Sequence, residues 1–437
     1  MTPRRLAVKA LMHQEQAGYA NLVLDAELKK CTPPLEVRDA AFAARIFYTV
    51  LEYQPLLDYL LNHFCKKPVA KLDAPVRAIL RAGLAQARYM DVPLPAAVNE
   101  SVKLTKAMGK TSASGMVNAV LRRAAQLPVQ EQSFTDPLER LQTYYCLSPA
   151  VAQLFYEQYA EDAFAMAAAF RNRPKSVIRV NTLKTTDEAL TKALQQEGHA
   201  VEQGPWPHAL LVDFQGSPVA GEPFADGAYH VQGLASQFAA LCVQAHPGQR
   251  VLDFCAAPGG KSLTLAQEMQ NTGELVSGEA VSSRVPLIDK AFHRCGITCA
   301  KAIQNDATIP NPALGKFDRV LCDVPCSGLG VIAKKPDIRY KDLDGMENLC
   351  AIQQKILQNG ADSLAENGRL VYSTCTVNFQ ENQAQIQLFL KNNPEFHVVK
   401  PEILLPGMQV EACGTLFLPQ KTGTDGFFVA ILEKLST

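Results

Sequence analysis

The sequence predicts an α/β chain of three parts: an all-helical N-terminal part, a small α/β module, and a large C-terminal part built on a mostly parallel sheet. Three observations predict this class. At 437 residues, with 47% hydrophobic and 20% charged residues, the chain is globular in composition and too long for one ordinary domain. Apolar residues recur at helical spacing through residues 1–128. From about residue 229, β-rich runs alternate with helical patterns, as in a doubly wound sheet.

Helical periodicity extends over residues 1–128. The stretch PVRAILRAGLAQARYM places one apolar face on Val76, Ile79, Leu80, Gly83, Leu84 and Ala87. The stretches AAVNESVKLTKAMG and GMVNAVLRRAAQL show further stripes of this kind. A polar, proline-containing segment, LPVQEQSFTDPLERL, predicts a linker near residues 128–140. We therefore expect an all-helical domain over residues 1–130.

The block from about residue 145 to 228 predicts a small α/β subdomain. SVIRV at 176–180 is rich in β-branched residues and is typical of a strand. DEALTKALQQEG follows as a helix that ends at Gly198, and HALLVD predicts a second strand.

The third domain is expected over residues 229–437. Five apolar runs predict its strands: QRVLDFCA, GELVSGEA, AKAIQNDA, FDRVLCDV and GRLVYSTC. The helical patterns between and after them are SLTLAQEMQ, SRVPLIDKAFHRCG, LCAIQQKILQNGADSLAENG and NFQENQAQIQLFLKNN. GTLFLPQ and DGFFVAILEK predict a closing antiparallel pair. Such alternation indicates helices on both faces of the sheet.

Charge is unevenly distributed along the chain. Residues 1–128 contain 18 Lys and Arg against 10 Asp and Glu, although the whole chain has a formal net charge of zero. A basic first part joined to an acidic remainder indicates that the first part meets a polyanion. On charge alone, an ordinary solvated helical surface stays open as the alternative.

Composition also limits the location and redox state of the chain. No apolar run approaches the roughly 20 residues of a membrane helix, and the first residues lack a signal-type apolar core, so we expect a cytoplasmic protein. The twelve cysteines contain no CxxC pair, and the eight histidines do not cluster with them at zinc-ligand spacing. We expect reduced thiols and no bound metal.

Polar or reactive residues follow the predicted strands of the third domain. Asp253, Glu279, Asp306 and Asp323 come at the ends of the first four, and Cys375 ends the fifth. Ligands of open α/β sheets bind at the carboxyl ends of the strands. These five side chains are therefore expected at one edge of the sheet.

The loop CAAPGGK lies between the first strand and its helix. Gly259 and Gly260 let the backbone approach a ligand closely, and the helix start offers N–H groups to an anion. Glu279, about 26 positions after Asp253, suits a ribose diol, and Asp306 suits an adenine amino group. Taken in order, the set indicates an adenosyl ligand.

Two cysteines differ from the rest by their position. Cys375 precedes Asn378 and Glu381, an N-cap-like pair at a helix start, which favours a thiolate. Cys326 follows Pro325 beside Asp323. The loop after Cys326 is basic and is predicted to contact a phosphate backbone through Lys334, Lys335, Arg339 and Lys341.

One reaction needs an acid and thiols beside an adenosyl ligand. Carbon 5 of a pyrimidine is a poor nucleophile, so its methylation requires a thiolate to add at carbon 6. An acid at nitrogen 3 stabilises the adduct, and a second group removes the carbon 5 proton. The base must be unpaired or flipped out of its helix to be reached.

These motifs resemble those of the NOL1/NOP2/Sun family of RNA 5-methylcytosine methyltransferases, which use S-adenosylmethionine. The resemblance is carried, in the family's order, by LDFCAAPGGKS, CDVPCSGLG with KKPDIRY, VYSTCTVNFQEN and DGFFVA. The N-terminal part is similar to the NusB-like RNA-binding domain of the bacterial small-subunit rRNA branch, and the block with IRVNTLK is similar to its small α/β subdomain. The resemblance covers essentially the whole chain and implies a Rossmann-like class I methyltransferase domain at its C-terminus.

The resemblance also implies roles for individual residues. Cys375 is the nucleophile, Cys326 assists proton removal or release of the methylated RNA, and Asp323 binds the cytosine edge and the cofactor side. The residues implied to line the S-adenosylmethionine site are Cys255, Ala256, Ala257, Pro258, Gly259, Gly260, Lys261, Glu279, Asp306 and Asp323. The family usually has Asp at position 279, and glutamate reaches further toward a ribose diol.

We therefore expect methyl transfer from S-adenosylmethionine to carbon 5 of a cytosine in 16S rRNA, by a monomer with no membrane partner. Two alternatives stay open: a NusB-like RNA-binding or antitermination factor with a vestigial α/β part, and the same chemistry on a tRNA or another rRNA site. DNA cytosine methyltransferases attack with the Pro-Cys cysteine, so the roles of Cys326 and Cys375 also stay open to reversal.

Overall fold

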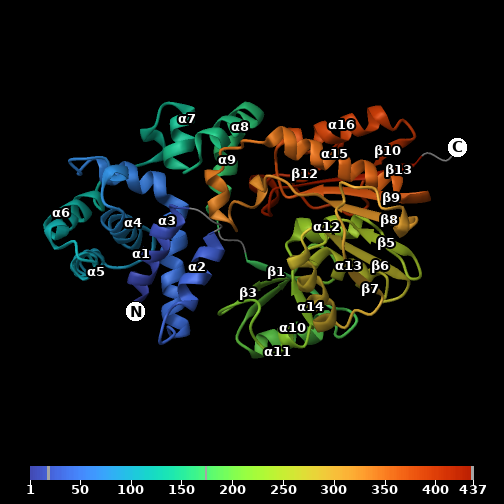
Figure 1. Cartoon of the computed structure of the whole chain (residues 1–437), viewed down its shortest axis with the longest axis horizontal. Coiled ribbons are helices and arrows are strands. Elements are labelled where there is room, and N and C mark those ends of the chain that lie inside the picture. Colours follow the sequence, from blue (N-terminus) through green and yellow to red (C-terminus); the bar gives the residue numbers. More distant parts are fainter. Residues whose placement is uncertain (17–19, 173–174, 435–437) are drawn as a thin grey trace. The chain divides into compact units, whose positions relative to one another are not determined.

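The computed structural model describes residues 1–16, 20–172 and 175–434. Residues 17–19, within the predicted helical domain, and 435–437, at the end of the predicted third domain, lie outside the described residues, as do 173–174. The chain forms two compact units (Figure 1). The first contains Met1–Ala167 and Lys334–Asp342, and the second contains Ala168–Ala333 and Leu343–Thr437. The predicted boundaries at residues 130, 145 and 228 stay predictions.

The first unit is helical, which confirms the fold predicted for residues 1–128 where the structure describes them. Its main helices are α1 (Pro3–Gln14), α2 (Ala20–Lys29), α3 (Val37–Asn62), α4 (Ala74–Tyr89), α5 (Leu94–Ala107) and α6 (Ser114–Ala124). Helices α1, α3, α5 and α6 all pack against α4. Because α4 is central, even its Arg81 is buried, where it donates to Glu15 at 2.6 Å and to Asp58 at 2.6 and 2.7 Å.

The first unit continues beyond the predicted linker. Its later elements are α7 (Pro137–Glu139), a π-helical turn (Arg140–Tyr144), α8 (Pro149–Tyr159) and α9 (Asp162–Ala169), whose last two residues belong to the second unit. Phe134 lies in the segment predicted as a linker and is only 1% exposed. That segment is therefore packed against the first unit over at least part of its length.

A short segment of the C-terminal half also belongs to the first unit. The 3-10 turn η8 (Pro336–Tyr340) packs on α3, which contains Pro55. A proline has no N–H, so Leu51, four residues earlier, lacks its usual helical donor, and the Tyr340 hydroxyl donates to the Leu51 carbonyl instead. Arg339 donates to the Glu52 carbonyl at 2.8 Å.

This packing corrects one expectation about the basic loop. Arg339 is 1% exposed and bound to a backbone carbonyl of α3, so the prediction that it contacts a phosphate backbone is wrong. Lys334, Lys335 and Lys341 are exposed, and their contact with phosphates stays a prediction.

The second unit begins with a small antiparallel sheet of strand order β2-β3-β1-β4. The strands are β1 (Ser176–Val180), β2 (Ala200–Gln203), β3 (Ala209–Asp213) and β4 (Tyr229–Val231). Helix α10 (Asp187–Gln196) starts where Thr186 accepts from the Ala189 N–H, and a short α11 (Glu222–Ala225) follows. The predicted strands at 176–180 and HALLVD are confirmed, whereas β2 and β4 were missed because they are only four and three residues long.

The larger sheet of the second unit has nine strands within the described residues, in the order β11-β12-β13-β9-β8-β5-β6-β7, with β10 paired to β13. Its strands are β5 (Arg250–Asp253), β6 (Glu274–Glu279), β7 (Ala300–Gln304), β8 (Phe317–Asp323), β9 (Leu364–Thr374), β10 (Phe396–Val399), β11 (Gln409–Glu411), β12 (Gly414–Phe417) and β13 (Phe427–Lys434). Strands β5 to β9 pair in parallel, while β13 pairs antiparallel with both β9 and β12. The predicted closing antiparallel pair is confirmed.

Helices cover both faces of this sheet, as predicted. The helices are α12 (Leu234–Cys242), α13 (Gly260–Glu268), α14 (Val285–Cys295), α15 (Met346–Asp362), α16 (Gln383–Asn392) and α17 (Pro419–Thr422). Helices α13 and α14 pack on β6, whereas α15 packs on β8 and β9, and Figure 1 shows α15 and α16 on the other side of the strands from α12 to α14. The prediction for residues 364–367 is wrong: they begin β9 rather than end a helix.

Candidate functional site

The five predicted strand-end residues do follow neighbouring strands of the large sheet. Asp253, Glu279 and Asp323 are the last residues of β5, β6 and β8, and Cys375 comes directly after β9. Asp306 follows β7 by two residues. These strands lie side by side and run parallel, so their carboxyl ends meet at one edge.

The predicted cofactor loop, 255–261, connects β5 to α13. The Ala256 N–H donates to the Gly278 carbonyl at 2.9 Å, which ties the loop to the next strand. Gly259 has a φ of +105°, a value that favours glycine, and the α13 helix begins at the next residue. Burial raises the pKa of the Cys255 thiol well above its ordinary value, so this cysteine stays protonated.

Behind the loop, Asp253 is buried and 1% exposed. Ser262 donates to its Oδ2 at 2.6 Å, and Ser277 in turn donates to Ser262 at 2.9 Å. Burial raises the pKa of Asp253 to about 7, and the charge of Asp323 adds to this, although the Ser262 hydrogen bond opposes it. Asp253 is therefore a carboxyl that holds its proton below neutral pH.

A partly buried ion pair forms between the loop and β8. Lys261 Nζ donates to Asp323 Oδ2 at 2.7 Å, and Ser373 Oγ donates to Asp323 Oδ1 at 2.7 Å. Burial by itself lowers the pKa of Lys261, but Asp323, Asp253 and the sulfur of Cys375 together raise it above its ordinary value. The site therefore holds a fixed positive charge close to Cys375.

The two predicted cysteines lie side by side. Their sulfurs are 3.3 Å apart, and both side chains are partly exposed. The hydrogen bond shared with Cys375, followed by burial and the negative charges of Cys375 and Glu381, raises the pKa of Cys326 well above its ordinary value. Cys326 therefore keeps its proton and can donate it in a hydrogen bond to Cys375.

The two acidic residues predicted to hold the adenosine part differ in exposure. Glu279 is 5% exposed; its Oε1 accepts from the Val281 N–H at 2.9 Å, and its Oε2 is 3.2 Å from Arg284. Asp306 is exposed, and its Oδ1 accepts from both the N–H and the hydroxyl of Thr308, which lowers its pKa. Both acids follow their strands as predicted, and both keep oxygens that can accept from a ligand.

Three parts of the site were not found from the sequence. Ser373 lies opposite Asp323 in the β8–β9 register, and it looked like one more residue of an apolar strand. Arg284, beside Glu279, carried no sequence signal. Glu381 was interpreted as one of an N-cap pair; Asn378 does accept from the Gln380 N–H, but the Glu381 side chain is fully buried.

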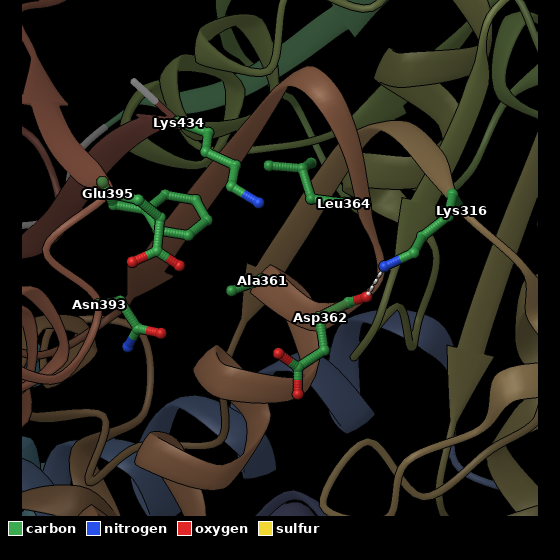
Figure 2. A pocket seen from close by; sticks show the side chains of 8 residues that line it. Lys316, Ala361, Asp362, Leu364, Asn393, Glu395 and Lys434 are labelled. Atoms are coloured by element: carbon green, nitrogen blue, oxygen red, sulfur yellow. Dashed lines mark hydrogen bonds between the residues drawn. The ribbon is translucent and has the colours of Figure 1, made fainter. Parts of the chain in front are cut away.

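A separate pocket lies at the opposite end of the same strands (Figure 2). Its volume is about 370 Å³, and its lining includes Lys316 before β8, Leu364 at the start of β9 and Lys434 at the end of β13. Asp362, Asn393 and Glu395 add polar side chains to its lining. None of the predicted site residues lines this pocket.

Neither a metal cluster nor a membrane span is found in the described part of the chain. No group of three His, Cys, Asp or Glu side chains there is placed to hold a metal ion, and no helix there is long and apolar enough to cross a bilayer. The expected monomeric state stays a prediction.

Comparison with known proteins agrees with this architecture. The 16S rRNA methyltransferase RsmB/F family matches residues 240–433, the NusB family matches residues 1–126, and the RsmF/B-like ferredoxin-like domain matches residues 151–219. A probable ribosomal RNA small subunit methyltransferase B from Synechocystis is 32% identical, over 95% of this chain and 96% of its own. A protein of the same description from Bacillus subtilis is 33% identical, over 99% and 98%.

A solved structure supports the fold. The methyltransferase homolog protein from Pyrococcus horikoshii superimposes with a TM-score of 0.62, covering 69% of this chain and 100% of its own at 24% identity. Together with full-length relatives above 30% identity, these matches confirm the predicted fold class and the predicted family. The chain belongs to the 16S rRNA methyltransferase RsmB/F family.

Proposed function

We propose that this protein transfers a methyl group from S-adenosylmethionine to carbon 5 of a cytosine in 16S rRNA, through a covalent bond between Cys375 and carbon 6. The observation that carries the proposal is the pair of sulfurs, 3.3 Å apart at the edge of the sheet, beside the Lys261–Asp323 ion pair. A methyltransferase acting on an amino nitrogen needs no thiol, since that nitrogen is already nucleophilic. Two thiols at this place favour carbon as the methylated atom.

The charges around the sulfurs favour Cys375 as the nucleophile. Lys261 is close enough to Cys375 for their charges to attract, and this attraction stabilises a thiolate there. Glu381 acts in the opposite sense on Cys326, whose raised pKa keeps it protonated. We therefore assign Cys326 as the donor of the hydrogen bond between the sulfurs, and Cys375 as the sulfur that acts as the thiolate.

In the proposed reaction the side chains of the site act one after another. The Cys375 thiolate adds to carbon 6, which makes carbon 5 electron-rich, and Asp323 binds the cytosine edge and so orients the ring. After carbon 5 has gained the methyl group, its proton leaves to a base, and the electron pair of that C–H bond expels the Cys375 thiolate. Cys326 assists this last stage: it accepts the carbon 5 proton once it has given up its own proton, or it helps to release the product.

The carboxyl edge suits S-adenosylmethionine, which supplies the methyl group as an electrophile. Gly260, the first residue of α13, has open space where a side chain would stand, beside backbone N–H groups of the helix start that are available to a ligand. Glu279 and Asp306 offer acceptors to a ribose and to an adenine amino group. The residues proposed to hold it are those from Cys255 to Lys261, with Glu279, Asp306 and Asp323.

The substrate follows from the relatives and from the first unit. The curated relatives are named as methyltransferases of small-subunit ribosomal RNA, and residues 1–126 match the NusB family. The excess of basic residues over residues 1–128 suits a polyanion. We infer that the helical unit binds 16S rRNA, and that the target cytosine is unpaired or flipped when it reaches Cys375.

The test is a methylation assay with nucleoside analysis. The purified protein is incubated with methyl-labelled S-adenosylmethionine and either 16S rRNA, assembled small subunits or tRNA, all from a strain lacking the gene. We expect labelled 5-methylcytidine from 16S rRNA, and bisulfite sequencing locates it. Label on a different nucleoside, or only in tRNA, would contradict the proposed reaction or substrate. Binding of RNA without any transfer would favour the antitermination-type alternative.

A further inference from the structure

Glu381 is a buried carboxylate that makes no contact with the reacting base in the scheme above. It ends the 3-10 turn η9 (Phe379–Glu381), shortly after Cys375, and its side chain is 0% exposed. Burial of a charged carboxylate costs several kcal/mol unless it is well paired with donors. The donors around Glu381 come from the loops of both cysteines.

On the side of Cys326, the carboxylate holds the next residue twice. The Ser327 N–H donates to Oε1 at 2.7 Å, and the Ser327 hydroxyl donates to Oε2 at 2.5 Å. Gln353 of α15 donates to Oε1 at 3.1 Å and to the Pro325 carbonyl at 3.0 Å. The residues before and after Cys326 are therefore both attached to Glu381, one directly and one through Gln353.

On the side of Cys375, the contacts continue the same network. The hydroxyls of Ser327 and Thr376 are 2.8 Å apart, and Asn378 donates to Glu381 Oε2 at 3.1 Å. The Tyr372 hydroxyl, from β9, donates to the Glu381 backbone carbonyl at 2.7 Å. The Glu381 carboxylate therefore connects the loop of Cys326 to the loop that follows Cys375, and the Glu381 backbone carbonyl attaches this residue to β9.

We propose that Glu381 is a positioning residue that holds the sulfurs of Cys326 and Cys375 at their working separation by clamping the two loops to one carboxylate. This inference rests on the proposed function, because it gives the two thiols cooperating roles. A reacting group that is misplaced by about 1 Å loses on the order of 100-fold in rate. Glu381 touches neither substrate nor cofactor in this scheme, and acts through Cys326.

Two substitutions and a matched control test the clamp in steady-state kinetics. Glu381→Ala removes every acceptor of the carboxylate, whereas Glu381→Gln keeps its shape and part of its hydrogen bonding. Glu366→Gln makes the same charge change at an exposed position near the other end of β9. We expect kcat to fall about 100-fold in Glu381→Ala and about 10-fold in Glu381→Gln, with the KM for S-adenosylmethionine within about 2-fold of wild type.

The spacing of the thiols can be measured without RNA. Phenylarsine oxide binds two nearby thiols, forming two As–S bonds and releasing one water. We expect wild type and Glu366→Gln each to bind one equivalent of phenylarsine oxide. Cys326→Ala and Cys375→Ala should both lose this equivalent, which identifies the binding pair among the twelve cysteines. Glu381→Ala should weaken the capture about 10-fold, and its circular dichroism should match that of wild type. This result does not depend on the methylated base, so it separates the clamp from the proposed reaction.

A pH profile gives a readout that a purely structural residue would not change. The charge of Glu381 contributes to the raised pKa of Cys326, so Glu381→Gln should shift the Cys326 limb of the profile to lower pH. If Glu381→Gln and Glu381→Ala both keep the kcat of wild type and bind phenylarsine oxide as well as wild type does, Glu381 does not position the two sulfurs. If Glu381→Ala does not fold, Glu381→Gln decides: a loss confined to kcat supports the clamp, and a loss in cofactor binding overturns it.

Discussion

The loops of Cys326 and Cys375 bring their sulfurs to 3.3 Å, yet their surroundings differ in charge and in support. Cys375 comes directly after a central strand, its carbonyl accepts from the Gly330 N–H at 3.0 Å, and Lys261 supplies positive charge. Cys326 lies three residues beyond β8 in a loop attached to the buried carboxylate of Glu381. Because Lys261 lies near Cys375 and Glu381 holds the loop of Cys326, we propose different roles for these two identical side chains.

The largest expected effect separates the two cysteines directly. Cys375→Ala removes the atom that bonds to carbon 6, so kcat should fall at least about 1,000-fold. Binding of S-adenosylmethionine, measured by calorimetry, should survive, since the proposed cofactor residues are untouched. Turnover close to that of wild type in Cys375→Ala would show that Cys375 is not the nucleophile.

The positive charge beside Cys375 gives the second effect. Lys261→Met leaves Asp323 without its cation and removes the attraction that stabilises the thiolate, so kcat/KM should fall by about 100-fold. The ascending limb of the pH–rate profile should also move to higher pH, because the thiolate then forms less readily. Lys261→Arg is the matched control, since it keeps the charge. If the ascending limb does not move in Lys261→Met, Lys261 does not stabilise the Cys375 thiolate.

The smallest effect concerns the carboxyl behind the ion pair. The folded chain keeps a proton on Asp253 up to about pH 7, whereas an unfolded chain releases it near pH 3.9, so this group makes stability fall as the pH rises through that window. Asp253→Asn does not titrate. Between pH 5.5 and 8, the free energy of unfolding of wild type should therefore fall by about 2 kcal/mol more than that of the variant.

Urea unfolding of both proteins at the two pH values measures this difference. A parallel pH dependence would mean that Asp253 is ionised. An ionised Asp253 would compete with Asp323 for Lys261. The difference in charge between the two cysteine loops could then not be attributed to the Lys261–Asp323 pair alone.

The sequence predicted the carboxyl edge well because strand ends follow from local patterns. Each predicted strand of the large sheet is present, and parallel pairing brings Asp253, Glu279, Asp323 and Cys375 to one edge. Asp306 lies two residues past its strand, within the usual uncertainty of a strand end. The predicted chemistry depends on these few positions and on the residue types placed there, and it stays a prediction.

The missed features depend on contacts between distant segments. Glu381 and Ser327 are 54 residues apart in the chain, so no local pattern shows that they are bonded. Arg339 looked like a phosphate contact because it stands among lysines, and only the folded structure shows that it binds the Glu52 carbonyl of α3. The short strands β2 and β4 have too few residues to show an alternating pattern.

The most direct test of the account asks which sulfur bonds to the RNA. Cys326→Ala is mixed with unmodified 16S rRNA and S-adenosylmethionine, and the protein is resolved on a denaturing gel. Cys375 should still attack, while release is impaired, so a slow protein–RNA band should accumulate that is absent from Cys375→Ala and from the double variant. A band in Cys375→Ala, with none in Cys326→Ala, would contradict the assignment of Cys375 as nucleophile.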